Sequence, residues 1–215
     1  ERFIGIYNFT PAQSVSIVDL EKRIFVEEIA TEGCGFIIPN GKLSFTSICA
    51  NGSFLTTDLD KSGAFKSSER TDIIFDSIED PIFEAPAIEN GTAYFLTYSG
   101  KVMPIDISKN RISVEQAWPL ATNDEEMSWR PGGITNMTSD SEGYVYVLMH
   151  PEGGEGTHKN PGNEVWVYDL KNKQRTSRIA LKNWGLVVGT SGSNQNKFLL
   201  VTNTDMAIDV YGLPN

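Results

Sequence analysis

One local pattern recurs along the 215-residue chain: a short run of β-branched or aromatic residues that ends in aspartate followed by leucine or isoleucine. A lysine follows each clear copy closely, and the copies span Ser14–Leu20, Phe54–Leu59, Lys101–Ile107 and Glu164–Leu170. A weaker fifth copy spans Ala207–Tyr211. Successive aspartates are roughly 40 to 60 residues apart, which is typical of β-propeller blades. We therefore predict an all-β fold, a β-propeller, with about four to five blades present.

The turns between these strand-like runs agree with this prediction. Asn40-Gly41, Asn51-Gly52 and Asn90-Gly91 are Asn-Gly pairs, the strongest short signal for a β-hairpin. The aspartate that ends each repeat suits a turn, because its carboxylate can accept backbone N–H groups. Helical periodicity is absent apart from a short candidate over 117–127.

A propeller must close its ring, and a count of about four and a half blades does not close one, so either a partner segment supplies the missing blades or the sequence is a fragment of a longer polypeptide. The chain also starts inside a strand-like run. We therefore expect residues 1–215 to be a single, partial β-propeller domain whose N-terminal blades are absent.

Composition excludes some classes of function. The formal net charge is −10 and the lysines and arginines are scattered, so a nucleic-acid groove is not expected. An acidic surface favours solubility, and could also steer a cationic partner or an amine. The apolar runs are far shorter than the roughly 20 residues of a membrane-spanning helix, so no membrane span is expected.

The sequence offers little catalytic chemistry. The two histidines, His150 and His158, fall in a Gly- and Pro-rich stretch over 149–163 that we interpret as a long hairpin loop. No regular spacing orients them as metal ligands, so no metal site is predicted. The paired carboxylates Glu27-Glu28 and Glu125-Glu126 are interpreted as solvated charges. No nucleophile motif is present, and no catalytic residue is predicted.

Two further features leave alternatives open. The cysteines, Cys34 and Cys49, flank strand-like runs and could form a disulfide across a hairpin, or remain buried thiols. The segment Trp129-Arg130-Pro-Gly132-Gly133 could be a binding segment, since Arg130 can reach a carboxylate or carbonyl, or a structural corner between blades.

Several segments together, in order, resemble the heavy chain of the methylamine and aromatic amine dehydrogenase family, in its C-terminal part. The resemblance covers nearly the whole chain, and the glycine-rich loop is more similar to the aromatic amine branch. The segments that carry it are Ile6–Leu20, Gly33–Ser53, Thr97–Ile107, Trp129–Gly133, Tyr144–Leu148 and, through His158-Lys159, Val165–Asp169.

The resemblance implies a seven-bladed propeller in a periplasmic assembly of two heavy and two light subunits. In that family the small subunit carries the tryptophan tryptophylquinone cofactor and oxidises a primary amine to aldehyde and ammonia. Electrons then pass to a blue-copper protein or a cytochrome. The heavy chain is the non-catalytic scaffold. The resemblance also implies a Cys34–Cys49 disulfide.

The resemblance makes six residues candidate contacts with the small subunit or its substrate channel: Trp129, Arg130, Gly132, Gly133, His158 and Lys159. The alternative function is a stand-alone propeller that binds or interacts without enzymatic activity. A propeller hydrolase is a third class, and it would need a catalytic constellation that the sequence does not offer.

Overall fold

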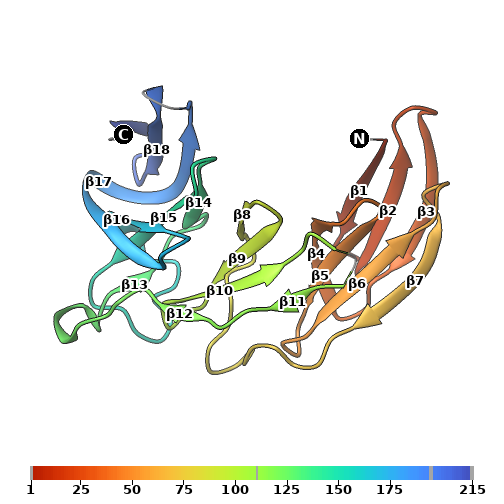
Figure 1. The fold of residues 1–215 in the computed structure, drawn as a ribbon, viewed down its shortest axis with the longest axis horizontal. Coiled ribbons are helices and arrows are strands. Elements are labelled where there is room, and N and C mark those ends of the chain that lie inside the picture. Colours follow the sequence, from red (N-terminus) through yellow and green to blue (C-terminus); the bar gives the residue numbers. More distant parts are fainter. Residues whose placement is uncertain (1, 110, 194–195, 214–215) are drawn as a thin grey trace. The chain divides into compact units, whose positions relative to one another are not determined.

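The computed structural model describes residues 2–109, 111–193 and 196–213, and strands dominate this part of the chain (Figure 1). The strands are β1 (Phe3–Asn8), β2 (Ser14–Asp19), β3 (Ile24–Ala30), β4 (Cys34–Asn40), β5 (Ser44–Cys49), β6 (Phe54–Leu59), β7 (Phe65–Arg70), β8 (Ala87–Glu89), β9 (Thr92–Leu96), β10 (Lys101–Asp106), β11 (Ser113–Val114), β12 (Trp118–Pro119), β13 (Arg130–Pro131), β14 (Met137–Ser139), β15 (Tyr144–His150), β16 (Gly162–Asp169), β17 (Gln174–Ser191), β18 (Phe198–Asn203) and β19 (Ile208–Gly212). The helix predicted over 117–127 is reduced to one 3-10 turn, η1 (Asp124–Glu126).

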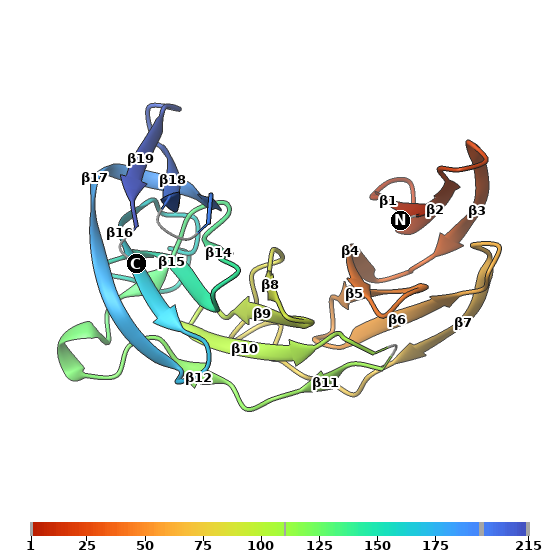
Figure 2. The ribbon, with the colours of Figure 1, turned by 45° about the horizontal axis from the view of Figure 1, so that its top comes forward.

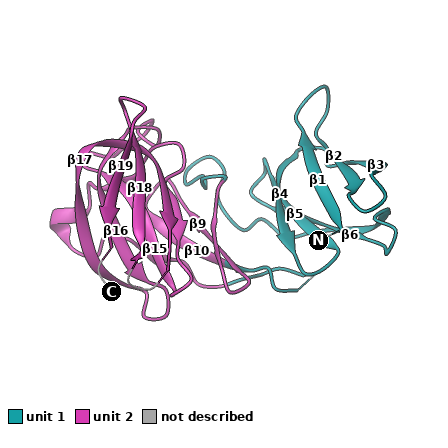
Figure 3. Cartoon of the chain, turned by 90° about the horizontal axis from the view of Figure 1, so that it is seen from above, with its two compact units in different colours: residues 1–84, 105–114 teal, residues 85–104, 115–215 magenta. Residues whose placement is uncertain are grey.

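The chain divides into two compact units (Figure 3). Unit 1 comprises residues 1–84 and 105–114, and unit 2 comprises residues 85–104 and 115–215. A further sheet has the strand order β11-β10-β9-β8, and β12 also pairs with β10. Strand β10 has residues in both units, because the division falls between Pro104 and Ile105.

Unit 1 contains two antiparallel sheets with the strand orders β1-β2-β3 and β4-β5-β6-β7. Their core consists of apolar side chains that alternate with polar ones along each strand, which is the pattern of a strand with one buried face. Val15 and Ile17 of β2 and Phe45 of β5 are buried together in this core. By contrast, every residue of the outer strand β7 is exposed.

Unit 2 is built around the 18-residue strand β17, whose two halves pair with different neighbours in one curved seven-stranded sheet (Figure 2). Its first half pairs with β16 and its second half with β18. Gly185 lies at the change-over, paired with both Gly162 and Asn203. A Cβ at Gly185 would lie 2.6 Å from a methyl carbon of Val201, so this crossing point requires glycine. The core enclosed between the two halves of this sheet includes buried Leu148 of β15.

The aspartate repeat marks equivalent strands, as predicted. In strand order β6 is third from β4, β10 is third from β8, β16 is third from β13, and β19 is third from the second half of β17. Within the described residues β19 pairs only with β18, so it forms an open edge. These repeated antiparallel sheets confirm the prediction of a partial β-propeller.

The predicted turn chemistry is confirmed for three of the aspartates. Asp19, Asp106 and Asp169 each accept a backbone N–H two residues ahead, at 2.8 to 3.0 Å. In the second repeat the prediction is wrong by two residues. There Asp60, not Asp58, accepts the N–H groups of Ser62 and Ala64, because β6 continues to Leu59 before the turn.

The three Asn-Gly pairs lie in hairpin turns, as predicted. Asn40-Gly41 joins β4 to β5, Asn51-Gly52 joins β5 to β6, and Asn90-Gly91 joins β8 to β9. Asn90 and Gly91 have φ values of 49° and 79°, which is the left-handed pair required by a two-residue hairpin of type I′.

Candidate functional site

The segment from Trp129 to Gly133 begins beside η1 and runs into β13. The ring of Trp129 is half-buried and packs against Trp166, with ring centroids 5.3 Å apart. Arg130 donates from one Nη1 to the carbonyl oxygens of Met127 at 2.7 Å and Trp129 at 2.8 Å. Arg130 therefore reaches carbonyl groups, as the sequence allowed, but they belong to its own loop.

The two glycines of this segment are buried where the backbone comes close to neighbouring strands and loops. A Cβ at Gly132 would clash with the backbone oxygen of Asn160 and lie 2.6 Å from a ring carbon of His150. Gly133 has φ of 103°, and a Cβ there would lie 2.6 Å from the oxygen of Leu186. This close packing explains why both positions are glycine, and it favours the interpretation of the segment as a structural corner.

The long loop between β15 and β16 packs onto the same segment. The N–H of Gly153 donates to the oxygen of Ser128 at 2.6 Å, and a Cβ at Gly153 would clash with the side chain of Arg130. At the base of the loop, Arg130 of β13 pairs with His150 of β15. The structure therefore brings together the two segments that the sequence singled out separately.

His158, near the far end of this loop, stacks on Tyr98 from the turn between β9 and β10. Their ring centroids are 4.3 Å apart and the rings are 16° from parallel. The neighbouring Lys159 is exposed. We call residues 128–133 and 151–161, together with Tyr98, the loop cluster. It presents Lys159 to solvent, while Gly132 and Gly133 lie beneath its surface.

The second histidine, His150, is buried at the end of β15. Its side chain is 2% exposed, and its Nδ1 lies 2.9 Å from the oxygen of Pro151. Its Nε2 is buried without a hydrogen-bond partner. Within the described ranges no three histidine, cysteine or acidic side chains converge as metal ligands.

A buried ionic pair was missed in the sequence. Glu125 and Glu126 were both predicted to be solvated, but Glu126 is 5% exposed, so the prediction is wrong for that residue. Glu126 accepts two hydrogen bonds from Arg175 of β17, at 2.7 and 2.8 Å. The bond from Arg175 lowers the pKa of Glu126, because it stabilises the ionised carboxylate.

A second arginine of β17 extends this pair into a network. Arg178 donates to both carboxylate oxygens of Glu164, at 2.6 and 2.9 Å. The guanidinium of Arg178 lies 4.9 Å from the ring centroids of both Trp129 and Trp166. Burial raises the pKa of Glu164, but the hydrogen bonds from Arg178 and Trp166 outweigh burial, so the pKa is lowered. The network anchors η1 and Trp129, and with them the start of the loop cluster.

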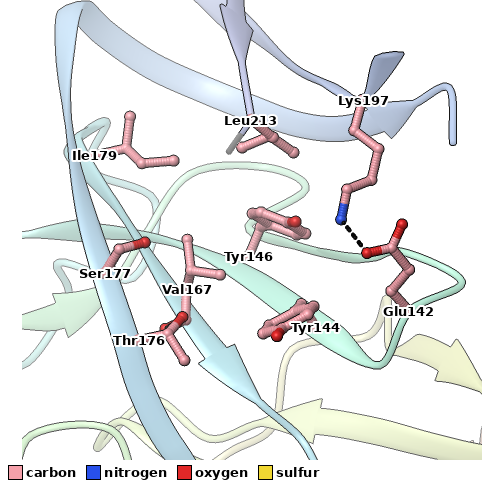
Figure 4. A pocket seen from close by; sticks show the side chains of 9 residues that line it. All are labelled: Glu142, Tyr144, Tyr146, Val167, Thr176, Ser177, Ile179, Lys197 and Leu213. Carbon is pink, nitrogen blue, oxygen red and sulfur yellow. Dashed lines mark hydrogen bonds and ion pairs between the residues drawn. The ribbon is translucent and has the colours of Figure 1, made fainter. Parts of the chain in front are cut away.

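A second network of ionic side chains borders a cavity of about 210 Å³ in unit 2 (Figure 4). Lys197 is buried and donates to Asp140 at 2.8 Å and Glu142 at 2.9 Å, while the Tyr146 hydroxyl donates to Asp140 at 2.8 Å. The cavity is lined by Glu142, Tyr144, Tyr146, Val167, Thr176, Ser177, Ile179, Lys197 and Leu213.

We attribute this cavity to an uncovered part of the β15–β17 sheet. Ser177 and Ile179 come from the first half of β17, and Leu213 directly follows β19. Within the described residues β19 pairs only with β18, so the sheet is open on the side of Leu213. The cavity is therefore not assigned as a ligand site.

Cys34 and Cys49 form a disulfide, as the resemblance implied. They face each other directly in the register of β4 and β5 and are 1% and 2% exposed. The bond therefore links the start of one strand to the end of the next. No helix in the described part of the chain is long and apolar enough to cross a membrane.

Comparison with known proteins gives a family match. Residues 1–208 match the family model described as methylamine dehydrogenase heavy chain. The methylamine dehydrogenase heavy chain of Methylorubrum extorquens is 27% identical over 208 residues, which are 95% of this chain and 50% of that protein. The heavy chain of Methylophilus methylotrophus is 26% identical over 185 residues, 85% of this chain and 45% of that protein. The chain thus spans about half the length of these relatives.

Solved structures with a similar fold are β-propellers. The β-propeller domain of Cps50 (Swd1) from Myceliophteria thermophila superposes with a TM-score of 0.59 at 14% identity, covering 100% of this chain and 62% of that one. The WD40 domain of SCAP from fission yeast gives a TM-score of 0.60 at 11% identity, covering 96% and 48%. At these identities the likeness establishes the fold alone.

Proposed function

Because this chain belongs to the methylamine dehydrogenase heavy-chain family, we propose that it is the heavy, non-catalytic scaffold subunit of a quinone-dependent amine dehydrogenase. The complete enzyme oxidises a primary amine to aldehyde and ammonia and passes the electrons to a small redox protein. The observation that carries the proposal is the family match over residues 1–208.

The partner in this proposal is a small catalytic subunit that carries tryptophan tryptophylquinone. Two tryptophans of the present chain, Trp129 and Trp166, are in contact, but Arg178 lies over both rings and Trp166 is fully buried. This pair is therefore built as a structural anchor, which supports placing the tryptophan-derived cofactor on the partner. We further propose a periplasmic assembly of two heavy and two small subunits, served by a blue-copper or cytochrome acceptor.

The loop cluster is the surface that we propose for contact with the small subunit or its substrate channel. It is carried by the end of β15 and the start of β16, two central strands with buried side chains, so its base is held rigidly. Loops on such a scaffold commonly carry binding residues. Among the predicted contacts, Trp129, Arg130, His158 and Lys159 have side chains that can contribute. Gly132 and Gly133 act through the backbone packing beneath them.

The test is co-expression with a small subunit of the methylamine dehydrogenase family, measuring complex formation and amine-dependent dye reduction. Lys159→Glu should weaken assembly at least tenfold, because it reverses a charge on the proposed surface. Lys171→Glu is the matched control, since this exposed lysine lies in the turn between β16 and β17, away from the loop cluster in sequence. Equal assembly of both variants would remove the loop cluster from the interface. A chain that forms no complex would favour a stand-alone propeller.

A further inference from the structure

Phe36 in unit 1 has an unusual backbone for a large side chain. Its φ is 65°, in the left-handed region that is uncommon for aromatic residues. It lies in a bulge of β4, where the register with β5 shifts between Gly35 and Ile38. Bulges re-aim side chains, and strain of this kind persists only where the surroundings impose it. Here the result is an aromatic side chain that is 44% exposed.

Two contacts hold Phe36 in this conformation, and two neighbouring features support them. Ser47 of β5 donates from its hydroxyl to the carbonyl oxygen of Phe36 at 2.8 Å. The ring stacks on Tyr7, with centroids 5.8 Å apart and the rings 26° from parallel. Gly35 leaves the space that Tyr7 needs, since a Cβ there would lie 2.9 Å from the Tyr7 hydroxyl. The disulfide at Cys34 fixes the strand directly before the bulge.

The Phe36 ring borders a groove of about 340 Å³ within unit 1. Its walls include Tyr7, Phe75, Ile82 and the Cys34–Cys49 disulfide, so they are largely apolar. We call it the cystine groove. Ile73 and Ile78, from the segment that supplies Phe75, are 70% and 83% exposed. Exposed apolar side chains therefore lie in the same segment as Phe75 of the groove, although these two isoleucines do not line it.

The segment that supplies Phe75, Ile82 and Glu84 to the cystine groove is acidic. The segment 71–84 contains five carboxylates and no lysine or arginine: Asp72, Asp76, Glu79, Asp80 and Glu84. Backbone N–H groups of Glu79 and Ile78 lower the pKa of Asp76, so that this carboxylate stays ionised near neutral pH. The arginine that precedes the segment, Arg70, is directed to Cys34 Sγ at 3.1 Å and Ser53 Oγ at 3.4 Å.

We propose that the cystine groove is a docking site for a protein partner that inserts an apolar side chain ringed by lysine or arginine. The apolar walls and Phe36 receive the side chain, and Glu84 with the other carboxylates of segment 71–84 selects the basic surroundings. A second copy of this chain fits poorly, because it would bring the same carboxylates and a further net charge of −10. The site is formed by unit 1 alone and is independent of the loop cluster.

The proposal is tested by NMR titration of the isotope-labelled full chain with two capped peptides, Lys-Lys-Trp-Lys-Lys and Glu-Glu-Trp-Glu-Glu. The basic peptide should bind saturably and shift the amide signals of Gly35, Phe36 and Ser77, and salt should weaken it. The acidic peptide should bind at least tenfold more weakly. Equal binding of both peptides, or no saturable binding of the basic one, would overturn the proposal.

Variants locate the site. Phe36→Asn should reduce basic-peptide affinity at least fivefold while the fold persists, because asparagine tolerates positive φ. The matched control is Phe65→Ala, which removes another exposed phenylalanine of unit 1, from β7, and should leave affinity unchanged. If both variants bind alike, the groove is not the site. Self-association that Phe36→Asn abolishes would also contradict the proposal, because the occupant would then be a second copy.

Discussion

Arg175 holds both carboxylate oxygens of Glu126, with N–O distances of 2.7 and 2.8 Å across 49 residues of sequence. The guanidinium of Arg175 also lies 4.4 Å from the ring centroid of Trp166. This ion pair links η1 to the first half of strand β17. Only Met127 and Ser128 separate η1 from Trp129. The ion pair therefore helps to position the start of the loop cluster.

Glu126→Gln should lower the free energy of unfolding by about 2 kcal/mol, because it removes the charge from paired, largely buried hydrogen bonds. The measurement is urea unfolding at neutral pH. Glu125→Gln is the matched control. Glu125 is the exposed neighbour of Glu126, and its substitution should change the free energy of unfolding by no more than about 0.5 kcal/mol. Equal effects from the two variants would mean that the Glu126 pair contributes no specific stability.

The same pair predicts a pH dependence. The pKa of Glu126 in the folded chain lies below its ordinary value of 4.5, chiefly because of the Arg175 hydrogen bond. Its contribution is therefore present above that ordinary value and is lost as the pH falls through the folded pKa. The stability difference between the unmodified chain and Glu126→Gln should narrow between pH 7 and pH 3. A difference that stays constant or widens over this range would contradict the assignment.

Lys197→Met should destabilise unit 2 by about 3 kcal/mol, because it leaves buried Asp140 without its cation. Adding Asp140→Asn to Lys197→Met should recover part of this loss, since the unpaired charge is then removed. Lys171→Met, at an exposed turn, is the control. Thermal unfolding of the four proteins makes the comparison, and a double variant less stable than Lys197→Met would argue against an ion pair here.

Gly132→Ala should destabilise the chain by about 1 to 3 kcal/mol, because the new Cβ meets backbone of Asn160, which cannot move aside as a side chain can. Gly154→Ala lies in the same loop cluster with open space around it and should have little effect. Chemical unfolding of both variants is the measurement. A neutral Gly132→Ala would show that the loop over β13 is loosely packed.

The parts of this molecule that sequence could predict depend on local chemistry. The turn aspartates, such as Asp19, and the Asn90-Gly91 hairpin are determined by residues a few positions apart, and they were enough to indicate the blades. The burial of Glu126 was not predicted because its partner, Arg175, lies 49 residues away in the sequence. Arg175 pairs with Tyr168 next to a register shift that no local sequence pattern reveals. Lys197 and Asp140, 57 residues apart, were missed for the same reason.

The candidate site divides in the same way. Trp129–Gly133 and His158-Lys159 were chosen from composition and family resemblance, and the structure shows that they share one loop cluster through Gly153 and Tyr98. That Gly132 and Gly133 act through backbone packing could be found only from the positions of Asn160 and Leu186. The conformation of Phe36 likewise depends on the pairing of β4 with β5.

The central claim is that this chain is a scaffold for a small quinone-bearing subunit. The most direct measurement is native mass spectrometry of the chain co-expressed with that subunit, combined with the visible absorbance of the purified complex. The account predicts an assembly of two heavy and two small chains, in which quinone absorbance is bleached by a primary amine and follows the small subunit on separation. A chain that remains alone, with no quinone-bearing partner, would contradict the account.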